Sequence, residues 1–263
     1  MPELPDVETW KRYVDATALH QKIAAVDVDA PRMLRGLTAE ALRTALEGSA
    51  FAATGRHGKF LFVQVSAGDW LMLHFGMTGR LRYHKQDGDR RGEARLRVRF
   101  AGGYRLDGLW PRRLGRIGLV KSPGAFVREE GLGIDALDPA LDVGTFSAML
   151  KDRRGSVKSA LMDQRFIAGI GNVYSDEMLF QAGLHPRLAA RGLDADRSRE
   201  LHRALRHVLR LAIERQAEPD RLPRSWLLGH RHEGARCPRC GETVKQVKIT
   251  GRTARLCPAC QKP

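Results

Sequence analysis

Cysteine is absent from most of the chain: none occurs before Cys237, and only four are present in 263 residues. A secreted disulfide scaffold usually spreads its cysteines more widely, so that class of protein is disfavoured. Apolar runs of about 20 residues, which a membrane-spanning helix needs, are also missing. The first ten residues, MPELPDVETW, are acidic and contain two prolines, whereas a secretory signal has a basic stretch followed by an apolar one. We therefore expect a bacterial cytoplasmic protein with no membrane partner.

Acidic residues are scarce relative to basic ones. The chain has 30 Asp and Glu against 45 Lys and Arg, giving a net charge of +15 and a pI near 10.3. A polyanionic partner is the simplest explanation, because Lys and Arg that neutralise phosphates release bound counterions. A basic solvated surface has other origins too, so charge alone leaves nucleic acid and a plain basic face both open.

The periodicity of apolar residues predicts an α+β multidomain protein. Leu4, Val7 and Val14 share one face of an N-terminal helix that the prolines at 2 and 5 help to start. Short apolar runs separated by glycine predict an antiparallel β-sandwich or barrel between about 20 and 125, with its clearest strands at 60–65, 70–75 and 96–100. Helical periodicity follows at 145–153, 157–163, 173–182 and 194–216. The expected domains are 2–125, an irregular linker at 126–143, a helical domain at 144–228, and a cysteine-rich end at 229–263.

The cysteines form two C-x2-C pairs, Cys237 with Cys240 and Cys257 with Cys260, separated by 16 residues. Each pair can supply two thiolates to a tetrahedral Zn²⁺, and the intervening segment can form a β-hairpin that turns at Gly251. Two disulfides are the alternative, which an intracellular chain disfavours. A closed four-thiolate site is structural, so we expect one structural zinc in a finger whose basic surface contacts nucleic acid.

Several short motifs occur in a fixed order along the chain. They are Pro2–Glu8 (PELPDVE), 55–60 (GRHGKF), 74–79 (HFGMTG), 111–115 (PRRLG), 169–174 (GIGNVY), and the cysteine pairs with Gly251-Arg252. Together they resemble the formamidopyrimidine-DNA glycosylase/endonuclease VIII family (Fpg/Nei, MutM-like) from residue 2 to residue 262. The resemblance implies a catalytic β-sandwich domain, a helix–two-turn–helix DNA-binding domain and a β-hairpin zinc finger.

That resemblance also implies a bifunctional DNA glycosylase/AP lyase of base excision repair. Removal of Met1 frees the secondary amine of Pro2, which attacks C1′ and leaves a cationic iminium (a Schiff base) that permits strand cleavage by elimination. Glu3 matches the family's general acid, which helps to open the sugar ring. Lys59 matches a lysine that contacts phosphate near the lesion; a solvated strand lysine is the alternative.

Further matches imply binding to damaged double-stranded DNA, with the protein acting as a monomer. Met77 and Arg112 match residues that fill the hole left by the flipped nucleotide, although a buried core methionine is the alternative for Met77. Asn172 matches an asparagine that binds phosphate at a helix start, and Arg252 matches the arginine at the tip of the finger. We assign structural roles to His74 and His185, because a lone histidine near a strand or turn is usually hydrogen-bonded.

Three differences from the family pattern concern recognition of the base. Leu114 replaces the usual Phe of the branch that removes 8-oxoguanine; it can still form an apolar wedge, with less stacking on the partner base. Trp110 replaces Asp, and the segment 217–236 is too short by roughly ten residues for the loop that covers flipped 8-oxoguanine. We therefore expect ring-opened purines, hydantoins or oxidised pyrimidines as substrates, with 8-oxoguanine doubtful.

Two other functions remain open from the sequence. A catalytically weak or inactive damaged-DNA-binding module would keep the fold and the finger, but Pro2, Glu3 and Lys59 are intact. An RNA-binding zinc-ribbon protein would explain the basic charge, but it would not explain the N-terminal motif.

Overall fold

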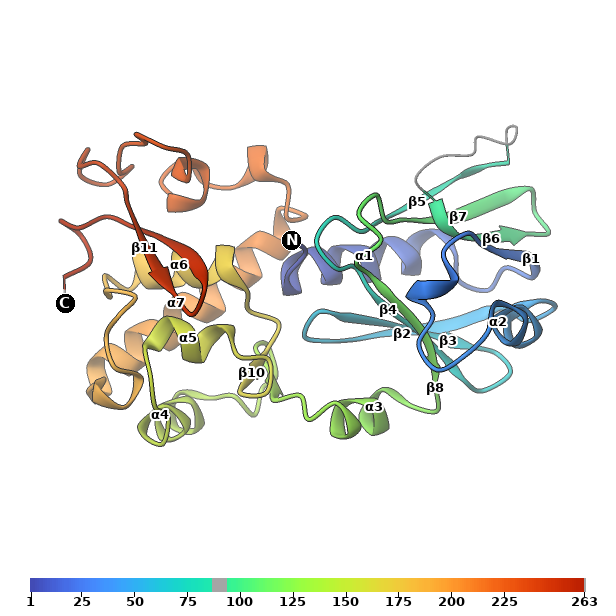
Figure 1. The fold of residues 1–263 in the computed structure, drawn as a ribbon, viewed down its shortest axis with the longest axis horizontal. Coiled ribbons are helices and arrows are strands. Elements are labelled where there is room, and N and C mark those ends of the chain that lie inside the picture. The colour runs from blue at the N-terminus through green and yellow to red at the C-terminus, as the bar shows by residue number, and fades with distance from the viewer. Residues whose placement is uncertain (87–93, 263) are drawn as a thin grey trace. The chain divides into compact units, whose positions relative to one another are not determined.

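The computed structural model describes residues 1–86 and 94–262 (Figure 1). Parts of the predicted 2–125 domain and Pro263 of the predicted finger lie outside the described residues. Contacts divide the chain into two compact units, Met1–Pro2 with Asp6–Gly131, and Glu3–Pro5 with Leu132–Pro263. Among the described residues, no helix combines the length and apolarity needed to cross a bilayer.

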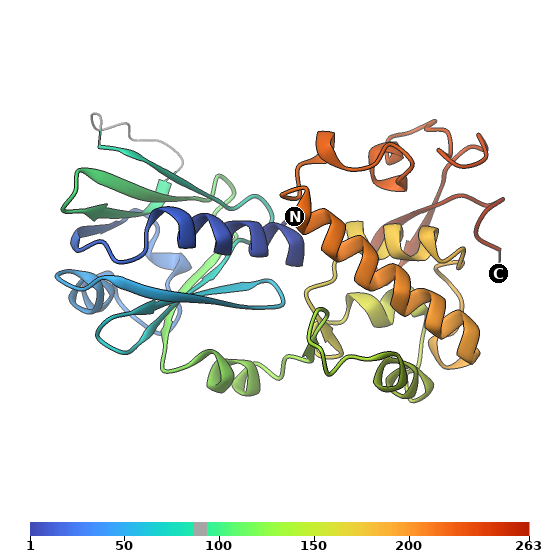
Figure 2. The same ribbon diagram turned by 180° about the vertical axis from the view of Figure 1, so that it is seen from behind.

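The first unit contains two four-stranded antiparallel sheets, in the orders β2-β3-β4-β8 and β1-β6-β7-β5. Helix α1 runs alongside the two sheets (Figure 2), and residues of all three elements share one core that includes Val7, Val14, Leu73 and Val98. The bounds are α1 Leu4–Thr17, β1 Ile23–Val28, η1 Pro31–Met33, α2 Ala39–Leu46, β2 Phe51–His57, β3 Phe60–Val65, β4 Trp70–His74, β5 Arg80–Lys85, β6 Ala94–Phe100, β7 Tyr104–Leu109, β8 Arg116–Val120 and α3 Pro123–Glu129.

Burial explains the sheet order. Five of the six residues in β3 are buried, as expected for a strand that is covered on both faces. Strand β5 instead exposes Arg80, Arg82 and Lys85 and buries Leu81, and such charges protect a sheet edge from pairing with another chain. The predicted strand 60–65 coincides with β3, and the predicted β-sandwich is confirmed.

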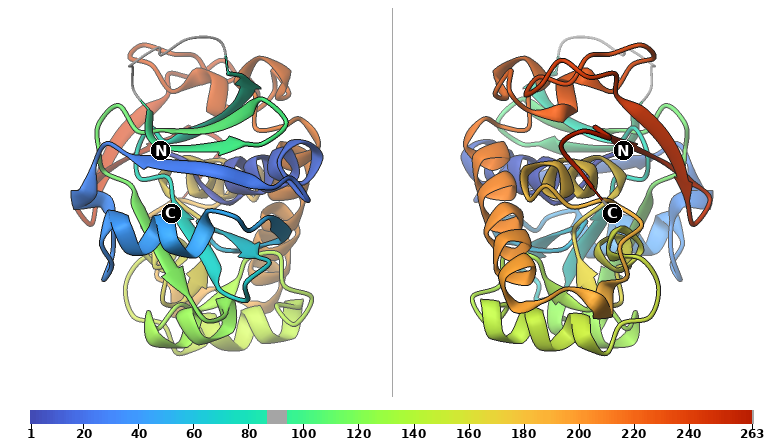
Figure 3. Two further views of the ribbon diagram at one scale, coloured as in Figure 1. Left: turned by 90° about the vertical axis from the view of Figure 1, so that its right-hand side faces the viewer. Right: turned by 90° about the vertical axis from the view of Figure 1, so that its left-hand side faces the viewer.

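The second unit is helical and ends in a hairpin. Its elements are β9 Ile134–Asp135, α4 Val143–Lys151, α5 Val157–Met162, β10 Ile167–Ala168, α6 Asn172–Gln181, η2 Ala190–Gly192, α7 Ala195–Glu214, η3 Pro219–Arg221, η4 Leu227–His230, β11 Lys245–Ile249 and β12 Arg252–Leu256. Helix α7 packs beside α6 (Figure 3) and buries Leu201, Leu205 and Val208. Leu4 belongs to the same core, so the start of α1 is part of this unit.

Side-chain caps set several helix starts. Thr38, Ser122, Asp142, Ser156 and Asp194 each accept a hydrogen bond from a backbone N–H in the first turn of α2, α3, α4, α5 and α7 respectively. The stretch 126–143, predicted to be irregular, contains the end of α3 and strand β9, which pairs in parallel with β10. The Ser122 cap and the following proline explain why that helix forms, and the role of 126–143 as a linker stays a prediction.

Candidate functional site

Glu3 is 1% exposed and its carboxylate is held by the start of helix α6. It accepts hydrogen bonds from the backbone N–H groups of Gly171 (2.6 Å), Val173 (2.8 Å) and Tyr174 (3.3 Å). The first N–H groups of a helix lack partners within the helix, and the positive end of its dipole favours an anion. The acidic residue therefore has a fixed orientation next to Pro2 in the chain, and Pro2 itself is half-buried.

Two glycines make this arrangement possible. A Cβ added at Gly171 would lie 2.4 Å from the carboxyl carbon of Glu3, so the carboxylate would have to move away. Gly169 has a φ of +112°, and a Cβ there would lie 2.6 Å from Leu4 Cδ1. The Leu4 N–H also donates to the Gly169 carbonyl at 3.0 Å. The Gly169-Ile170-Gly171 turn thus fits around the N-terminal segment.

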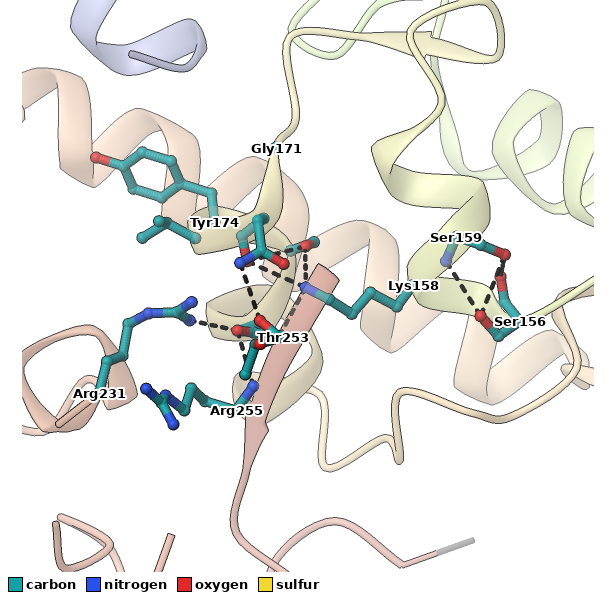
Figure 4. A network of polar contacts seen from close by, with 12 residues as sticks. Ser156, Lys158, Ser159, Gly171, Tyr174, Arg231, Thr253 and Arg255 are labelled. Carbon is teal, nitrogen blue, oxygen red and sulfur yellow. Dashed lines mark hydrogen bonds and ion pairs between the residues drawn. The ribbon is translucent and has the colours of Figure 1, made fainter. Parts of the chain in front are cut away.

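A buried ion pair lies close to this turn, and Figure 4 shows its Lys158 side chain reaching the start of α6. Lys158 Nζ lies 2.7 Å from Asp176 Oδ1, and both side chains are buried. The same ammonium donates to the Asn172 carbonyl (3.0 Å) and to Ser175 Oγ (2.6 Å). Burial lowers the pKa of Lys158, and the nearby Asp176 carboxylate partly opposes that shift. Lys158 therefore fixes the Asn172–Val173 peptide, whose N–H is one of the three that hold Glu3.

Asp176 and Asn172 link helix α6 to the hairpin β11–β12. Asp176 Oδ2 accepts hydrogen bonds from the Arg255 backbone N–H (3.0 Å) and from the Arg231 guanidinium. Asn172 Nδ2 donates to the Thr253 carbonyl at 3.0 Å. Arg252, beside Thr253 at the hairpin turn, is exposed. The structure therefore brings Asn172 close to the turn that carries Arg252, although the two residues belong to separate sequence motifs.

Glu177 is a second buried carboxylate on α6. It accepts hydrogen bonds from the Leu228 backbone N–H (2.8 Å) and from Gln181 Nε2 (2.7 Å). Burial raises the pKa of Glu177 to about 7 despite these donors. This contact attaches η4 to α6, which positions the segment leading into the cysteine pairs.

The four cysteines are arranged for one tetrahedral metal ion. Their sulfur atoms all lie within 4.8 Å of one another, with Sγ–Sγ distances of 3.9 Å between Cys237 and Cys260 and 3.5 Å between Cys240 and Cys257. A Zn–S bond of about 2.3 Å in a tetrahedron implies sulfur atoms about 3.8 Å apart. A disulfide requires about 2.05 Å, and all four cysteines are free. The donor set therefore fits one structural zinc, as predicted.

Lys59 lies in the tight turn between β2 and β3, in the first unit. Gly58 has a φ of +54° in this turn. Arg56 binds the Gly58 carbonyl (3.2 Å) and pairs with Glu8 of α1 at 3.1 Å. The side chain of Lys59 is largely buried, which does not fit a solvated strand lysine. Arg56 and Glu8 thus attach the lysine turn to helix α1.

His74, at the end of β4, orders the loop that follows it. Its Nδ1 accepts a hydrogen bond from the Gly76 N–H at 3.2 Å, and its ring lies 4.9 Å from that of Phe60. Burial, together with the positive charges of Arg116 and Lys59, lowers the pKa of His74 to about 4. Its neutral form is therefore the one that supports the Gly76–Met77 turn. His185 likewise accepts from the Arg187 N–H, at 3.2 Å.

Two apolar side chains of the first unit are exposed at loop tips. Met77 is 41% exposed and Leu114 is 52% exposed, so Met77 is not a core methionine. Arg112 and Arg113 beside Leu114 are also exposed. Exposed apolar residues next to arginines suit contact with stacked bases between phosphates.

The two other departures from the family motifs are visible in the fold. Trp110 is 1% exposed and packs in the core of the first unit. The segment 217–236 forms the short turns η3 and η4, and it is anchored by buried Leu222, Trp226 and Leu227.

Sequence reasoning missed three groups that support the site. Lys158 and Asp176 occupy positions that helical periodicity assigns to the core, and Arg56 lies in a strand. A charged residue on an apolar helix face could have identified Lys158 and Asp176, because buried charges are rare unless they are paired.

Three family models match the chain. The formamidopyrimidine-DNA glycosylase N-terminal domain matches residues 1–117, its H2TH domain matches 132–222, and the zinc finger found in FPG and IleRS matches 234–263. The formamidopyrimidine-DNA glycosylase of Moorella thermoacetica is 36% identical over 100% of this chain and 93% of its own length. That of Thermus thermophilus is 36% identical over 99% of this chain and 98% of its own.

A solved structure is similar throughout. The Lactococcus lactis formamidopyrimidine-DNA glycosylase, crystallised with DNA containing an abasic site, has a TM-score of 0.91 and 27% identity, covering 99% of this chain and 100% of that one.

Proposed function

The chain belongs to the formamidopyrimidine-DNA glycosylase family, and we propose that Pro2, Glu3 and Lys59 carry out its chemistry. The protein is a DNA glycosylase of base excision repair that also has the family's AP lyase activity, and DNA is its partner. The observation that supports the catalytic assignment best is the fixed orientation of the Glu3 carboxylate by three N–H groups at the start of α6.

The reaction starts at the Pro2 nitrogen once Met1 has been removed, because an amide nitrogen has no nucleophilic lone pair. The amine attacks C1′ of the lesion nucleotide, the glycosidic bond breaks, and the base leaves with the proton that the amine gives up. The protonated form of Glu3 gives its proton to the sugar ring oxygen as the ring opens, which leaves an iminium between Pro2 and C1′ and an ionised Glu3. Loss of the C2′ proton then breaks the C3′–O bond and nicks the strand.

Lys59 and the exposed tips bind the DNA. The Lys59 ammonium contacts a phosphate near the lesion, while Asn172 and Arg252 bind phosphates from the second unit. Met77, Arg112 and Leu114 occupy the space that the flipped nucleotide leaves. The cysteines of the finger hold the zinc ion, which fixes the hairpin that carries Arg252.

Ring-opened purines, hydantoins and oxidised pyrimidines are the proposed substrates. The Lactococcus lactis protein has been crystallised with DNA containing N7-benzyl-Fapy-dG, a ring-opened purine. The short 217–236 segment covers the flipped base less than the longer loop of the family's 8-oxoguanine branch. Leu114 stacks less on the partner base than the Phe of that branch. A panel of duplexes with one defined lesion each, scored for base release and strand ends, tests this preference.

Borohydride trapping on abasic DNA tests the mechanism. The iminium is reduced to a stable covalent adduct, so the protein with Met1 shown by mass spectrometry to be absent should be trapped. Pro2→Gly should nearly abolish the adduct. Glu3→Gln should slow base excision more than cleavage of a preformed abasic site. No adduct from the processed wild-type chain would contradict the assignment of Pro2, and equal binding of lesion and undamaged DNA without product would indicate an inactive binding module.

Two further properties complete the proposal. The protein acts as a monomer on damaged double-stranded DNA, and it works in the bacterial cytoplasm on the nucleoid. Sedimentation of the protein with and without a lesion duplex tests the first property.

A further inference from the structure

Trp110 is a large buried side chain that the proposed chemistry does not use. It follows strand β7, and its ring stacks on Phe75 with centroids 6.1 Å apart and planes 16° from parallel. Its Nε1 is buried and has no hydrogen-bond partner in the described part of the chain. A buried indole usually pairs its N–H, so packing of the ring outweighs that loss at this position.

Three glycines make room for the indole. A Cβ added at Gly108 would lie 2.3 Å from Trp110 Cζ3, one at Gly115 would lie 2.2 Å from Nε1, and one at Gly79 would lie 2.5 Å from Nε1. Any other residue at these positions would displace the ring. Trp110 therefore fills a space that these backbones enclose on several sides.

Two of these glycines belong to the loops that carry the exposed tips. Gly79 closes the 75–79 loop, in which its N–H donates to the Phe75 carbonyl at 2.8 Å and Met77 is exposed. Gly115 follows Leu114 directly. The loops also touch each other, because a Cβ at Gly76 would lie 2.4 Å from the Leu114 carbonyl oxygen. The indole thus lies beneath both tips.

We propose that Trp110 is a positioning residue that holds Met77 and Leu114 together as one rigid wedge for duplex DNA. This inference rests on the proposed hole-filling role of those two residues. A wedge enters the base stack more favourably if its tips keep a fixed spacing, since a mobile tip would lose conformational entropy on insertion. The indole prevents that motion, and it does so without touching DNA.

Trp110→Leu tests the proposal, because the shorter side chain leaves space beside Gly79 and Gly115, which face the five-membered ring, as well as beside Gly108. Excision of a ring-opened purine from a duplex should fall about tenfold or more, as expected for a misplaced contact group. Borohydride trapping on a single-stranded abasic oligonucleotide, which has no partner base to displace, should stay within about twofold of wild type. A 2-aminopurine opposite an abasic site should also brighten less on binding, since the wedge unstacks it less.

Two variants separate positioning from stability. In Trp110→Leu/Gly108→Ala the new methyl group fills part of the vacated space beside β7, so the unfolding midpoint should partly recover, but duplex excision should stay low because the space beside Gly79 and Gly115 remains. Phe100→Leu, a buried aromatic of the same unit that contacts Phe51, should lower stability without changing the ratio of duplex excision to single-strand trapping.

Equal losses in both assays for Trp110→Leu would overturn the proposal. Recovery of duplex excision together with stability in the double variant would also overturn it. Absence of single-strand trapping in the wild-type chain would instead contradict the catalytic assignment of Pro2. The 2-aminopurine signal would still test the wedge in that case, because it does not depend on catalysis.

Discussion

Glu3 and Gly171 are joined by a hydrogen bond of 2.6 Å from the Gly171 N–H to the Glu3 carboxylate, across 168 positions of sequence. The glycine has two functions here. Its N–H begins the set of donors at the start of α6, and its missing side chain leaves the space that the carboxylate occupies. The proposed acid therefore depends on a backbone that lies far away in the sequence.

Gly171→Ala should remove this support. The added methyl group would lie 2.4 Å from the Glu3 carboxyl carbon, so the carboxylate must leave its three donors. We expect excision to fall on the order of 100-fold, the typical cost of an ångström-scale displacement of a reacting group. Single-turnover base release measures the effect. Gly229→Ala is the matched control, because a Cβ at Gly229 meets nothing within 4 Å, and an equal loss in both variants would contradict the argument.

Lys158→Met should destabilise the second unit by about 3–5 kcal/mol, the usual cost of removing one partner from a buried ion pair. The substitution leaves Asp176 buried with less compensation and releases the Asn172 carbonyl. Urea unfolding followed by hydrogen exchange in α6 measures the loss. Lys151→Met, at an exposed position of α4, should change stability little. If the loss in Lys158→Met/Asp176→Asn equals the sum of the losses in the two single variants, the pair does not account for the loss.

His74 should make the first unit less stable at acidic pH. The pKa of His74 is lowered from 6.5 to about 4 in the folded state, so between these values the unfolded chain binds a proton that the folded chain does not. Stability is therefore fully present above pH 6.5 and falls as the pH drops toward 4, by about 3 kcal/mol in total. Hydrogen exchange of β3 and β4 amides at several pH values follows this unit alone, and His74→Gln should flatten the dependence.

Glu177 provides an internal contrast in the second unit. Its pKa is raised to about 7, so the folded chain keeps a proton that the unfolded chain loses above its ordinary pKa of 4.5. Stability of that unit should fall as the pH rises from 4.5 to 7, which is the opposite direction to the His74 effect. Amides of α6 should report this slope, and a slope of the same sign as that of the first unit would contradict the Glu177 assignment.

Zinc removal should weaken DNA binding without abolishing the amine chemistry. Chelation leaves the β11–β12 hairpin without its metal, so Arg252 and the Asn172–Thr253 contact lose their fixed positions. Affinity for a lesion duplex should fall about tenfold or more, and its dependence on salt should become less steep because fewer phosphates are contacted. Titrations at several salt concentrations measure both effects. Added zinc should restore the chelated wild-type protein but not Cys240→Ser, and full affinity without metal would contradict this role.

Local patterns in the sequence predict those parts of the molecule that local forces determine. The spacing of Cys237, Cys240, Cys257 and Cys260 is sufficient to predict the zinc site, and the apolar run 60–65 is sufficient to predict β3. The contact between Glu3 and Gly171 is not local, so only the family motifs place the two residues at one site. Lys158 is a charged residue on the buried face of α5, and the sequence does not predict its pairing because its partner Asp176 lies on another helix. In the sequence, Trp110 is only a departure from the family motif. Its packing against Gly79, Gly108 and Gly115 is visible only in the folded chain.

Glu3–Pro5 belongs to the unit formed by residues 132 onward, which has a consequence for the order of events during synthesis. The ribosome makes Glu3 almost at once, but the N–H groups that hold its carboxylate are made some 170 residues later. A nascent chain with a complete β-sandwich therefore still lacks the donors that orient the Glu3 carboxylate, even if the Pro2 amine is already exposed. Reactivity toward DNA should then appear only after α6 has left the ribosome and folded, so the enzyme is kept inactive until more than two-thirds of it has been made.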